Sequence, residues 1–163
     1  MHNGGGAQKG AGFEREICVK LSLWITKGKR RDCLWRSSMS GGRATVGLRK
    51  GYDLSRQAGD ICAISPEGLL LTNQYYFECK FRKNIQLERF VVHNEGSLAE
   101  WWKKACQEAK AHNREPILIA KGNRMPVLVV TLSGSRFNPK PLAHLPKCDI
   151  GILGRILREK FVP

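Results

Sequence analysis

Four side chains with the chemistry of a phosphodiester-cutting site occur in the first half of the chain: Glu14, Asp60, Glu78 and Lys80. Carboxylate and backbone carbonyl oxygens are the hard ligands that Mg²⁺ prefers. A lysine beside them can orient a water molecule and offset developing negative charge. Glu78 and Lys80 stand two residues apart on a predicted strand, so both point to one face. Asp60 opens another apolar strand, and pairing of the two strands would bring the carboxylates together.

A Glu-x-Lys pair taken alone is typical of a solvent-facing strand, so the coincidence of several groups carries the prediction. Residues 13–26 read as a helix, and steps of about 100° per residue place Glu14 within its apolar face and Glu16 outside it. A carboxylate inside an apolar stripe is costly unless it is paired or binds a metal. Glu14 is therefore a third candidate acid of the same site.

The elements that must position these groups follow from hydrophobic periodicity and turn residues. Helices are predicted over 13–26 and 97–113, and strands over 33–38, 60–65, 75–81, 116–120 and 127–132, with a second short strand at 69–72. The stretch 150–161 fits a short helix or a strand. This order predicts a mixed α/β fold with a central sheet flanked by helices.

The chain of 163 residues is long enough for one domain, and its 42% of hydrophobic residues can form a core. We expect a flexible segment at 1–12, a domain at 13–132 with a basic loop insertion at 41–58, and a C-terminal extension at 133–163 packed on the same domain. The sequence lacks an apolar run of the roughly 20 residues that a membrane helix needs. A soluble, cytoplasmic or nucleoid-associated protein is therefore expected.

The net charge of +14 is distributed unevenly, since residues 1–58 hold 12 basic and 4 acidic groups and so carry +8. Such a field attracts polyanions, and nucleic acid is the default partner. A membrane surface is the competing partner, but this stretch shows no basic amphipathic helix. The basic segments 27–32 and 43–56 fit either phosphate contacts or a solvated surface.

The six cysteines, at positions 18, 33, 62, 79, 106 and 148, show neither Cys-x-x-Cys nor zinc-finger spacing. We expect reduced thiols that do not bind metal. Trp101 and Trp102 share a helix face with apolar residues, which favours a place in the core or in a dimer interface over base stacking.

Four short blocks resemble one nuclease family in their order along the chain. They are KGAGFERE at 9–16, RSSMSG at 36–41, GDI at 59–61 and FECK at 77–80. Together the blocks resemble the signature of the archaeal-type Holliday junction resolvases, which belong to the PD-(D/E)XK nuclease superfamily and are often virus-encoded. The resemblance spans about residues 9–130, most of the chain.

The resemblance implies a Mg²⁺-dependent endonuclease, with Mn²⁺ as a substitute, that acts as a homodimer on four-way DNA junctions without a small-molecule cofactor. It implies metal ligation by Asp60, Glu78, the Cys79 carbonyl and Glu14, catalysis by Lys80, contact with the scissile strand by Ser37 or Ser40, and phosphate binding by Arg15 and Arg36. The charge distribution adds Lys29, Arg30, Arg31, Arg43 and Lys50 to the expected nucleic-acid contacts.

The sequence also departs from the family pattern. The segment 41–59 is longer than usual, and so is the interval from Asp60 to Glu78, where 69–73 looks inserted. Asp53 is a rival metal ligand, but only Asp60 leads directly into a strand. A nuclease of the same fold that cuts duplex or flap DNA, and a basic DNA-binding module without catalysis, remain as alternatives.

Overall fold

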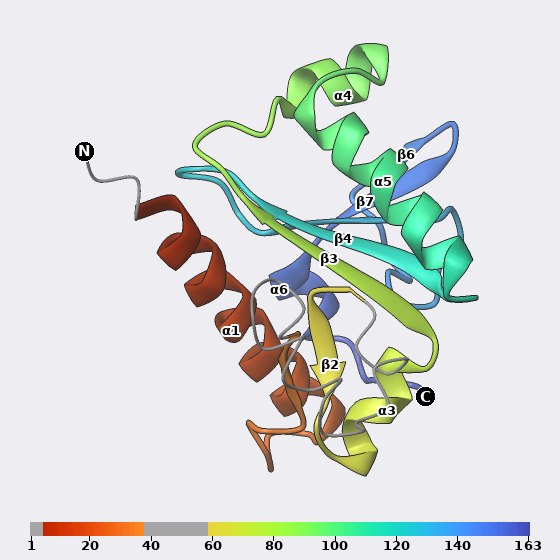
Figure 1. Cartoon of the computed structure of the whole chain (residues 1–163). Helices are drawn as coiled ribbons and strands as arrows, with labels where there is room; N and C mark the ends of the chain where they lie inside the picture. Colours follow the sequence, from red (N-terminus) through yellow and green to blue (C-terminus); the bar gives the residue numbers. More distant parts are fainter. Residues whose placement is uncertain (1–4, 38–58) are drawn as a thin grey trace.

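The computed structural model describes residues 5–37 and 59–163 of the chain. Its elements are α1 (Gly5–Ile25), β1 (Leu34–Arg36), β2 (Ile61–Ala63), α3 (Pro66–Thr72), β3 (Tyr75–Phe81), α4 (Leu87–His93), α5 (Ser97–Ala111), β4 (Glu115–Lys121), β5 (Leu128–Thr131), β6 (Ala143–Leu145), β7 (Cys148–Ile152) and α6 (Leu153–Ile156) (Figure 1). Helices flank a mixed five-stranded sheet, which confirms the predicted fold class.

The five-stranded sheet has the strand order β3-β4-β5-β7-β6, with β3 at one edge. Strands β3 and β4 run parallel, and α4 and α5 form the crossover between them. All the other pairs in this sheet are antiparallel. Strands β1 and β2 form a separate antiparallel pair. Residues 59 and 60, just before β2, run beside β3, because the Asp60 N–H donates to the Phe77 carbonyl at 2.8 Å.

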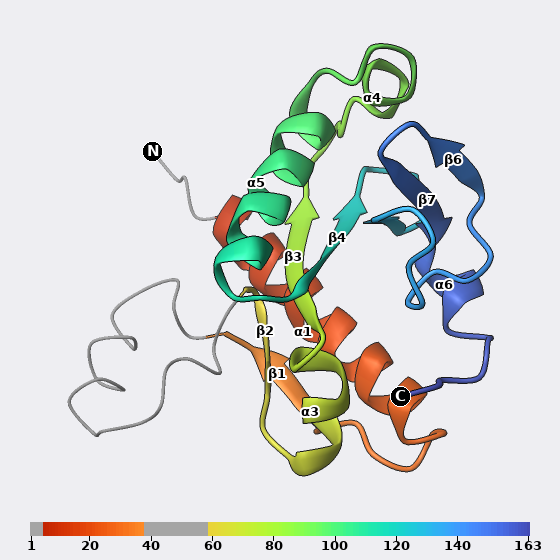
Figure 2. The same ribbon diagram turned by 90° about the vertical axis from the view of Figure 1, so that its right-hand side faces the viewer.

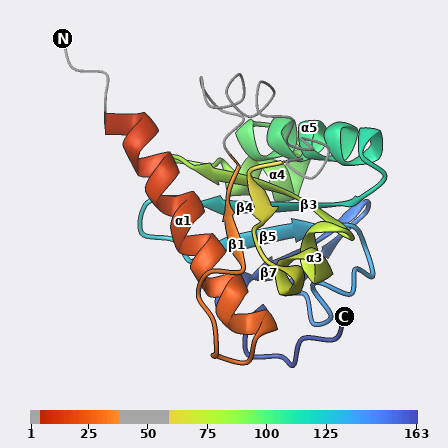
Figure 3. The same ribbon diagram turned by 60° about the horizontal axis from the view of Figure 1, so that its bottom comes forward.

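Each face of the sheet is covered by its own apolar cluster. On one face α1 buries Phe13, Ile17 and Leu21 against the odd-numbered residues of β3 and β4. On the other face α5 buries Leu98 and Trp102 among its cluster, and Trp101 packs at the margin. Figures 2 and 3 show the sheet between these helices. Both tryptophans thus belong to the α5 side of the core, one of the two places expected for them.

The predicted strand at 69–72 is wrong, because these residues form the last turn of α3. Pro66 stands at the start of the helix, where its fixed φ is already helical and its missing N–H is not needed. Gly68 then lets α3 approach β1 and β2 closely, since a Cβ atom there would lie 2.3 Å from the Cys33 carbonyl oxygen. Pro66, Glu67 and Gly68, residues of types that are common in turns, therefore form the first turn of a helix.

The two ends of the chain also differ from expectation. Helix α1 begins at Gly5, so most of the segment expected to be flexible is helical and continues the packed part of α1. In the C-terminal region, β7 lies between β5 and β6 within the sheet and is followed by α6. The residues after 132 therefore complete the sheet. The stretch 150–161, expected to be a strand or a helix, contains the end of a strand followed by a helix.

Helix α4 was not predicted, and left-handed residues at Gln86 and Asn94 bound it.

No helix among the described residues is long and apolar enough to cross a membrane. All six cysteines lie in the described ranges and are free thiols, five of them buried. Burial raises the pKa of Cys18 to about 12, so this thiol stays protonated and serves the core as a small apolar group.

Candidate active site

Asp60 is held at the exposed edge of β3 by two backbone contacts. Its own N–H donates to the Phe77 carbonyl at 2.8 Å, and its Oδ2 accepts a hydrogen bond of 2.7 Å from the Cys79 N–H. Gly59 makes this approach possible, because it has a φ of +84° and a Cβ atom there would lie 2.5 Å from the Phe77 oxygen. The Gly-Asp dipeptide thus joins the aspartate directly to the strand that carries the other candidate groups.

Glu78 and Lys80 lie on the α5 side of β3, as the predicted alternation requires. Glu78 is only 5% exposed, and the Lys80 Nζ donates a hydrogen bond to its Oε1. The neighbouring residues Phe77 and Cys79 point to the opposite face, where they join the α1 cluster. A strand of alternating character therefore holds an ion pair on one face and core residues on the other.

Burial, and after it the negative charges of Glu78 and Glu14, raise the pKa of Asp60 from its usual 3.8 to about 6. The hydrogen bond from the Cys79 N–H and the positive charge of Lys80 act in the opposite direction. Asp60 is thus a buried carboxylate beside a second carboxylate. A bound divalent cation would favour the charged form of both groups.

The oxygen donors at this edge fit a magnesium ion. Phe77 and Cys79 point their backbone groups toward Asp60, so the Cys79 carbonyl shares an edge with the Asp60 carboxylate. Glu78 is the second carboxylate. Within residues 5–37 and 59–163, no three His, Cys, Asp or Glu side chains gather as a metal-binding group. Magnesium commonly uses one or two carboxylates and keeps several waters, so this smaller set is chemically sufficient.

Glu14 lies on the inner side of α1, as the helical angles predict, but its carboxylate is paired with Arg36. The Arg36 Nε donates to Glu14 Oε2 at 2.9 Å, and both side chains are partly buried. Glu16, by contrast, is more exposed and pairs with Lys20. The structure thus pairs Glu14 with Arg36, and the charge of Glu14 still acts on Asp60 and raises its pKa. Among the described residues, Glu14, Asp60 and Glu78 do not gather as a metal-binding group of three acids.

We expect Glu14→Gln to weaken DNA binding more than it weakens magnesium binding, because Glu14 holds the Arg36 guanidinium in place. The expected loss of DNA affinity is about 10-fold, because a hydrogen bond to a charged group contributes about 1.5 kcal/mol. Titration of DNA in Ca²⁺ and a magnesium titration of thermal stability measure the two effects. Arg36→Lys, which keeps the charge but loses the Nε donor, serves as the partner variant. A large rise in the magnesium midpoint for Glu14→Gln alone would instead make Glu14 a metal ligand.

The other predicted DNA contacts are spread more widely. Arg15 is exposed on α1 beside Glu14. Lys29 and Arg31 are exposed beyond the end of α1, which lies 11 residues and about 16 Å along the helix from Glu14. The Arg30 guanidinium donates hydrogen bonds to Asp32 at 3.0 Å and to Glu67 at 3.1 Å. It is therefore engaged within the protein and is not a free group on the surface.

Of the two serines predicted to contact the scissile strand, Ser37 lies among the described residues and Ser40 does not. Ser37 is buried, and its backbone N–H donates to the Asp60 carbonyl at 2.8 Å, so it helps to position Asp60. Ser40, Arg43, Lys50 and the rival metal ligand Asp53 lie outside the described residues, as does the loop insertion at 41–58.

Sequence reasoning missed a ring pair close to these groups. Tyr76, which shares a face of β3 with Glu78, is stacked against His112 at the end of α5. The two residues are 36 positions apart, so only the crossover that returns α5 past β3 brings them together. The alternation of β3 places Tyr76 beside Glu78, but no local signal identifies its partner.

A mixed sheet flanked by helices, with an aspartate at its edge and a Glu-x-Lys pair on the edge strand, is the core of a PD-(D/E)XK nuclease. The family model described as "Phage putative PDDEXK endonuclease" matches residues 6–140, and the chain belongs to this family. The match includes α1, all the candidate site residues and β5. No curated protein matches the chain, and no solved structure matches it. Family membership makes the protein an endonuclease, with DNA as its substrate.

Proposed function

We propose that this endonuclease is a Mg²⁺-dependent, structure-specific enzyme that cuts four-way DNA junctions as a homodimer. The observation that carries the catalytic part is the Asp60 carboxylate, bonded to the Cys79 N–H next to the Glu78–Lys80 pair. The junction part is supported by the four ordered sequence blocks and by the net charge of +14. A family described only as phage endonucleases is compatible with this substrate.

Asp60, Glu78 and the Cys79 carbonyl would hold the magnesium ion, and Mn²⁺ suits the same oxygen donors. When bound, the cation supplies Lewis acidity and offsets the negative charge that develops on the phosphodiester. The Cys79 N–H donates to Asp60 Oδ2, whereas Asp60 Oδ1 accepts no hydrogen bond from the residues that the structure describes. The backbone of β3 therefore sets the orientation of one ligand and supplies another.

Lys80 performs the steps that need a proton donor or a positive charge. Its Nζ is held by Glu78, so the ammonium group has a fixed position beside the reacting phosphate. There it orients the attacking water and steadies the charge of the transition state. Arg36, which Glu14 holds in place, and exposed Arg15 bind neighbouring phosphates. Because these contacts are to the backbone of DNA, base specificity is slight.

A comparison of substrates tests the proposal. We expect rapid paired cuts on opposite strands of a four-way junction in Mg²⁺, and slower cutting of a flap or a linear duplex of the same sequence. Sedimentation at micromolar concentration is expected to show a dimer. Equal rates on all three substrates would refute junction specificity while leaving the nuclease assignment in place. No cleavage of any substrate in Mg²⁺ or Mn²⁺ would refute the catalytic assignment as well.

A flap- or duplex-cutting enzyme on the same fold is the second candidate. It is favoured by the two longer intervals, 41–59 and 60–78, where the sequence departs from the resolvase pattern. Part of the second interval is α3, which packs against β2 and β3. The same substrate comparison decides between the two, because only this candidate cuts an unbranched or flapped substrate fastest.

A further inference from the structure

The stacked pair of Tyr76 and His112 offers an aromatic surface next to the catalytic strand. Their ring centroids are 6.0 Å apart and the ring planes differ by 13°. Tyr76 is only 6% exposed and packs on Ala109 of α5, so its ring is fixed. His112, the residue that caps the C-terminus of α5, is exposed, and its ring makes no hydrogen bond to any part of the chain that the structure describes. One exposed ring therefore rests on a rigid support.

This surface lies a short distance along β3 from the proposed reacting groups. Tyr76 is two residues before Glu78 on the same face of the strand, a separation of about 7 Å. The ring pair therefore lies close to the phosphate that Glu78 and Lys80 would contact.

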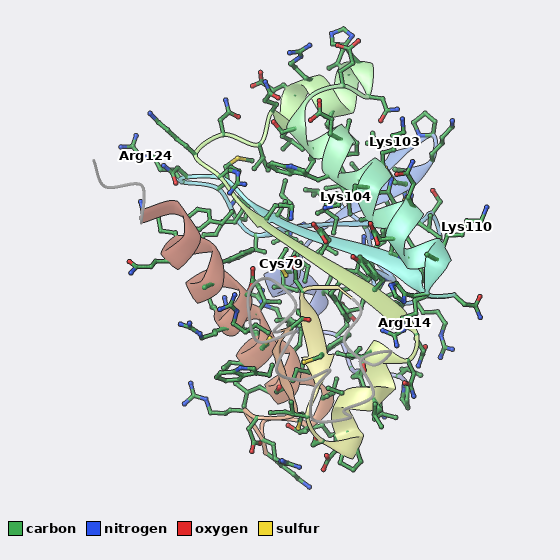
Figure 4. The ribbon with its side chains drawn as sticks, in the orientation of Figure 1. Cys79, Lys103, Lys104, Lys110, Arg114 and Arg124 are labelled. Atoms are coloured by element: carbon green, nitrogen blue, oxygen red, sulfur yellow. The ribbon has the colours of Figure 1, made fainter. Side chains whose placement is uncertain are left out.

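Positive groups accompany the ring pair along α5. Figure 4 shows Lys103, Lys104, Lys110 and Arg114 following this helix and the turn after it. Lys110 and Arg114, the two nearest in sequence to His112, line a hollow of about 450 Å³. The Nη1 of Arg114 is buried and has no hydrogen-bond partner among the described residues. Glu108 and Glu115 lie on the same stretch, so the local charge is mixed and favours a contact of limited strength.

We propose that His112, supported by Tyr76, stacks against a DNA base close to the scissile phosphate, and that Lys110 contacts the backbone beside it. The proposal rests on the proposed function for the position of the scissile phosphate. Stacking on an aromatic ring requires an unpaired or displaced base. The class of ligand is therefore a nucleotide of locally opened DNA, as is found at a branch point.

Pairing a protein variant with a DNA variant tests the contact directly. Each nucleotide within three positions of the cut is replaced in turn by an abasic residue, and the affinity of the junction is measured in Ca²⁺ without cleavage. For the wild-type protein we expect a loss of about 10-fold at one position, the usual effect of one base–aromatic stack. His112→Ala should weaken binding of intact DNA by the same factor and should then be insensitive to the abasic residue.

Matched variants separate stacking from other effects. His112→Phe, which keeps a ring, should retain the abasic sensitivity of the wild type, and His93→Ala should also retain it because His93 is exposed on α4 away from β3. Lys110→Gln should lower the slope of log Kd against log salt by about 1, whereas Lys147→Gln, in the turn between β6 and β7, should not.

The contact is refuted if the abasic scan affects His112→Ala and the wild type equally. It is also refuted if His112→Phe behaves like His112→Ala. A protein that cuts no substrate would refute the proposed function. The contact of His112 could still be tested, because binding is measured without cleavage and the abasic scan can cover the whole junction.

Discussion

Asp60→Asn is expected to abolish magnesium-dependent cleavage and, at the same time, to make the metal-free protein more stable. The loss of a carboxylate that holds the metal should reduce the cleavage rate by about 1000-fold or more, because the cation supplies several kcal/mol to the transition state. Binding of uncut DNA should remain. The amide oxygen of asparagine can still accept the hydrogen bond from the Cys79 N–H.

The gain in stability follows from the pKa of Asp60, which burial and, after it, the charge of Glu78 raise from the usual 3.8 to about 6. The folded state therefore binds this proton more tightly than the unfolded state does. Above about pH 6 the ionised carboxyl costs stability, and the cost disappears as the pH falls toward 4. Asparagine carries no such cost, so we expect a gain of about 1–3 kcal/mol at pH 8 and little gain at pH 4.

Denaturant unfolding in EDTA at pH 4 and pH 8 measures this gain, and Mg²⁺ titration of the melting temperature measures the lost metal site. Asp32→Asn is the matched control, since Asp32 is an exposed partner of Arg30 whose pKa is lowered by that hydrogen bond. It should lose a little stability and keep full activity. Wild-type cleavage by Asp60→Asn, or an equal magnesium response of the two proteins, would contradict the assignment of Asp60.

Gly59→Ala is expected to inactivate the enzyme without touching any reacting group. The new methyl group would lie 2.5 Å from the Phe77 carbonyl oxygen, and the φ of +84° is strained for alanine. The chain must move away from β3, which lengthens both hydrogen bonds of Asp60 to that strand. A displacement of about 1 Å at a reacting centre costs about 100-fold in rate. The strain should also lower the free energy of unfolding by about 1–3 kcal/mol.

Gly10→Ala provides the control, because a Cβ atom there meets nothing within 4 Å and the position lies within α1. Alanine favours a helix over glycine, so this variant should be slightly more stable and fully active. Cleavage rates at saturating Mg²⁺ and unfolding curves compare the two variants. If Gly59→Ala keeps the wild-type rate, the backbone approach at this glycine is unnecessary for positioning Asp60.

Sequence patterns predicted those parts of the fold that local periodicity determines. The alternation of 75–81 gave the correct strand and the correct faces for Glu78 and Lys80. The short apolar runs near 116–120 and 127–132 are strands buried on both sides. The angles of α1 placed Glu14 inward and Glu16 outward, in agreement with their different ion pairs.

The failures occur where distant residues decide the outcome. The pairing of Glu14 with Arg36 joins α1 to β1, and the pairing of Arg30 with Glu67 joins a loop to α3. Neither pair has a signal at sequence level, because ion pairs between elements depend on how those elements pack. The helix at 66–72 was missed for a related reason, since its leucines and threonine also suit a strand and only the start at Pro66 distinguishes the two.

The place of β7 has a consequence for the order in which the protein is made. Strand β4 pairs with the catalytic strand, β5 pairs with β4, and the other side of β5 pairs with β7, residues 148–152. When all the proposed catalytic residues of a nascent chain have left the ribosome, β7 has still to be made and β5 still lacks this partner. The sheet that supports the catalytic strand is therefore complete only after residue 152 has been made.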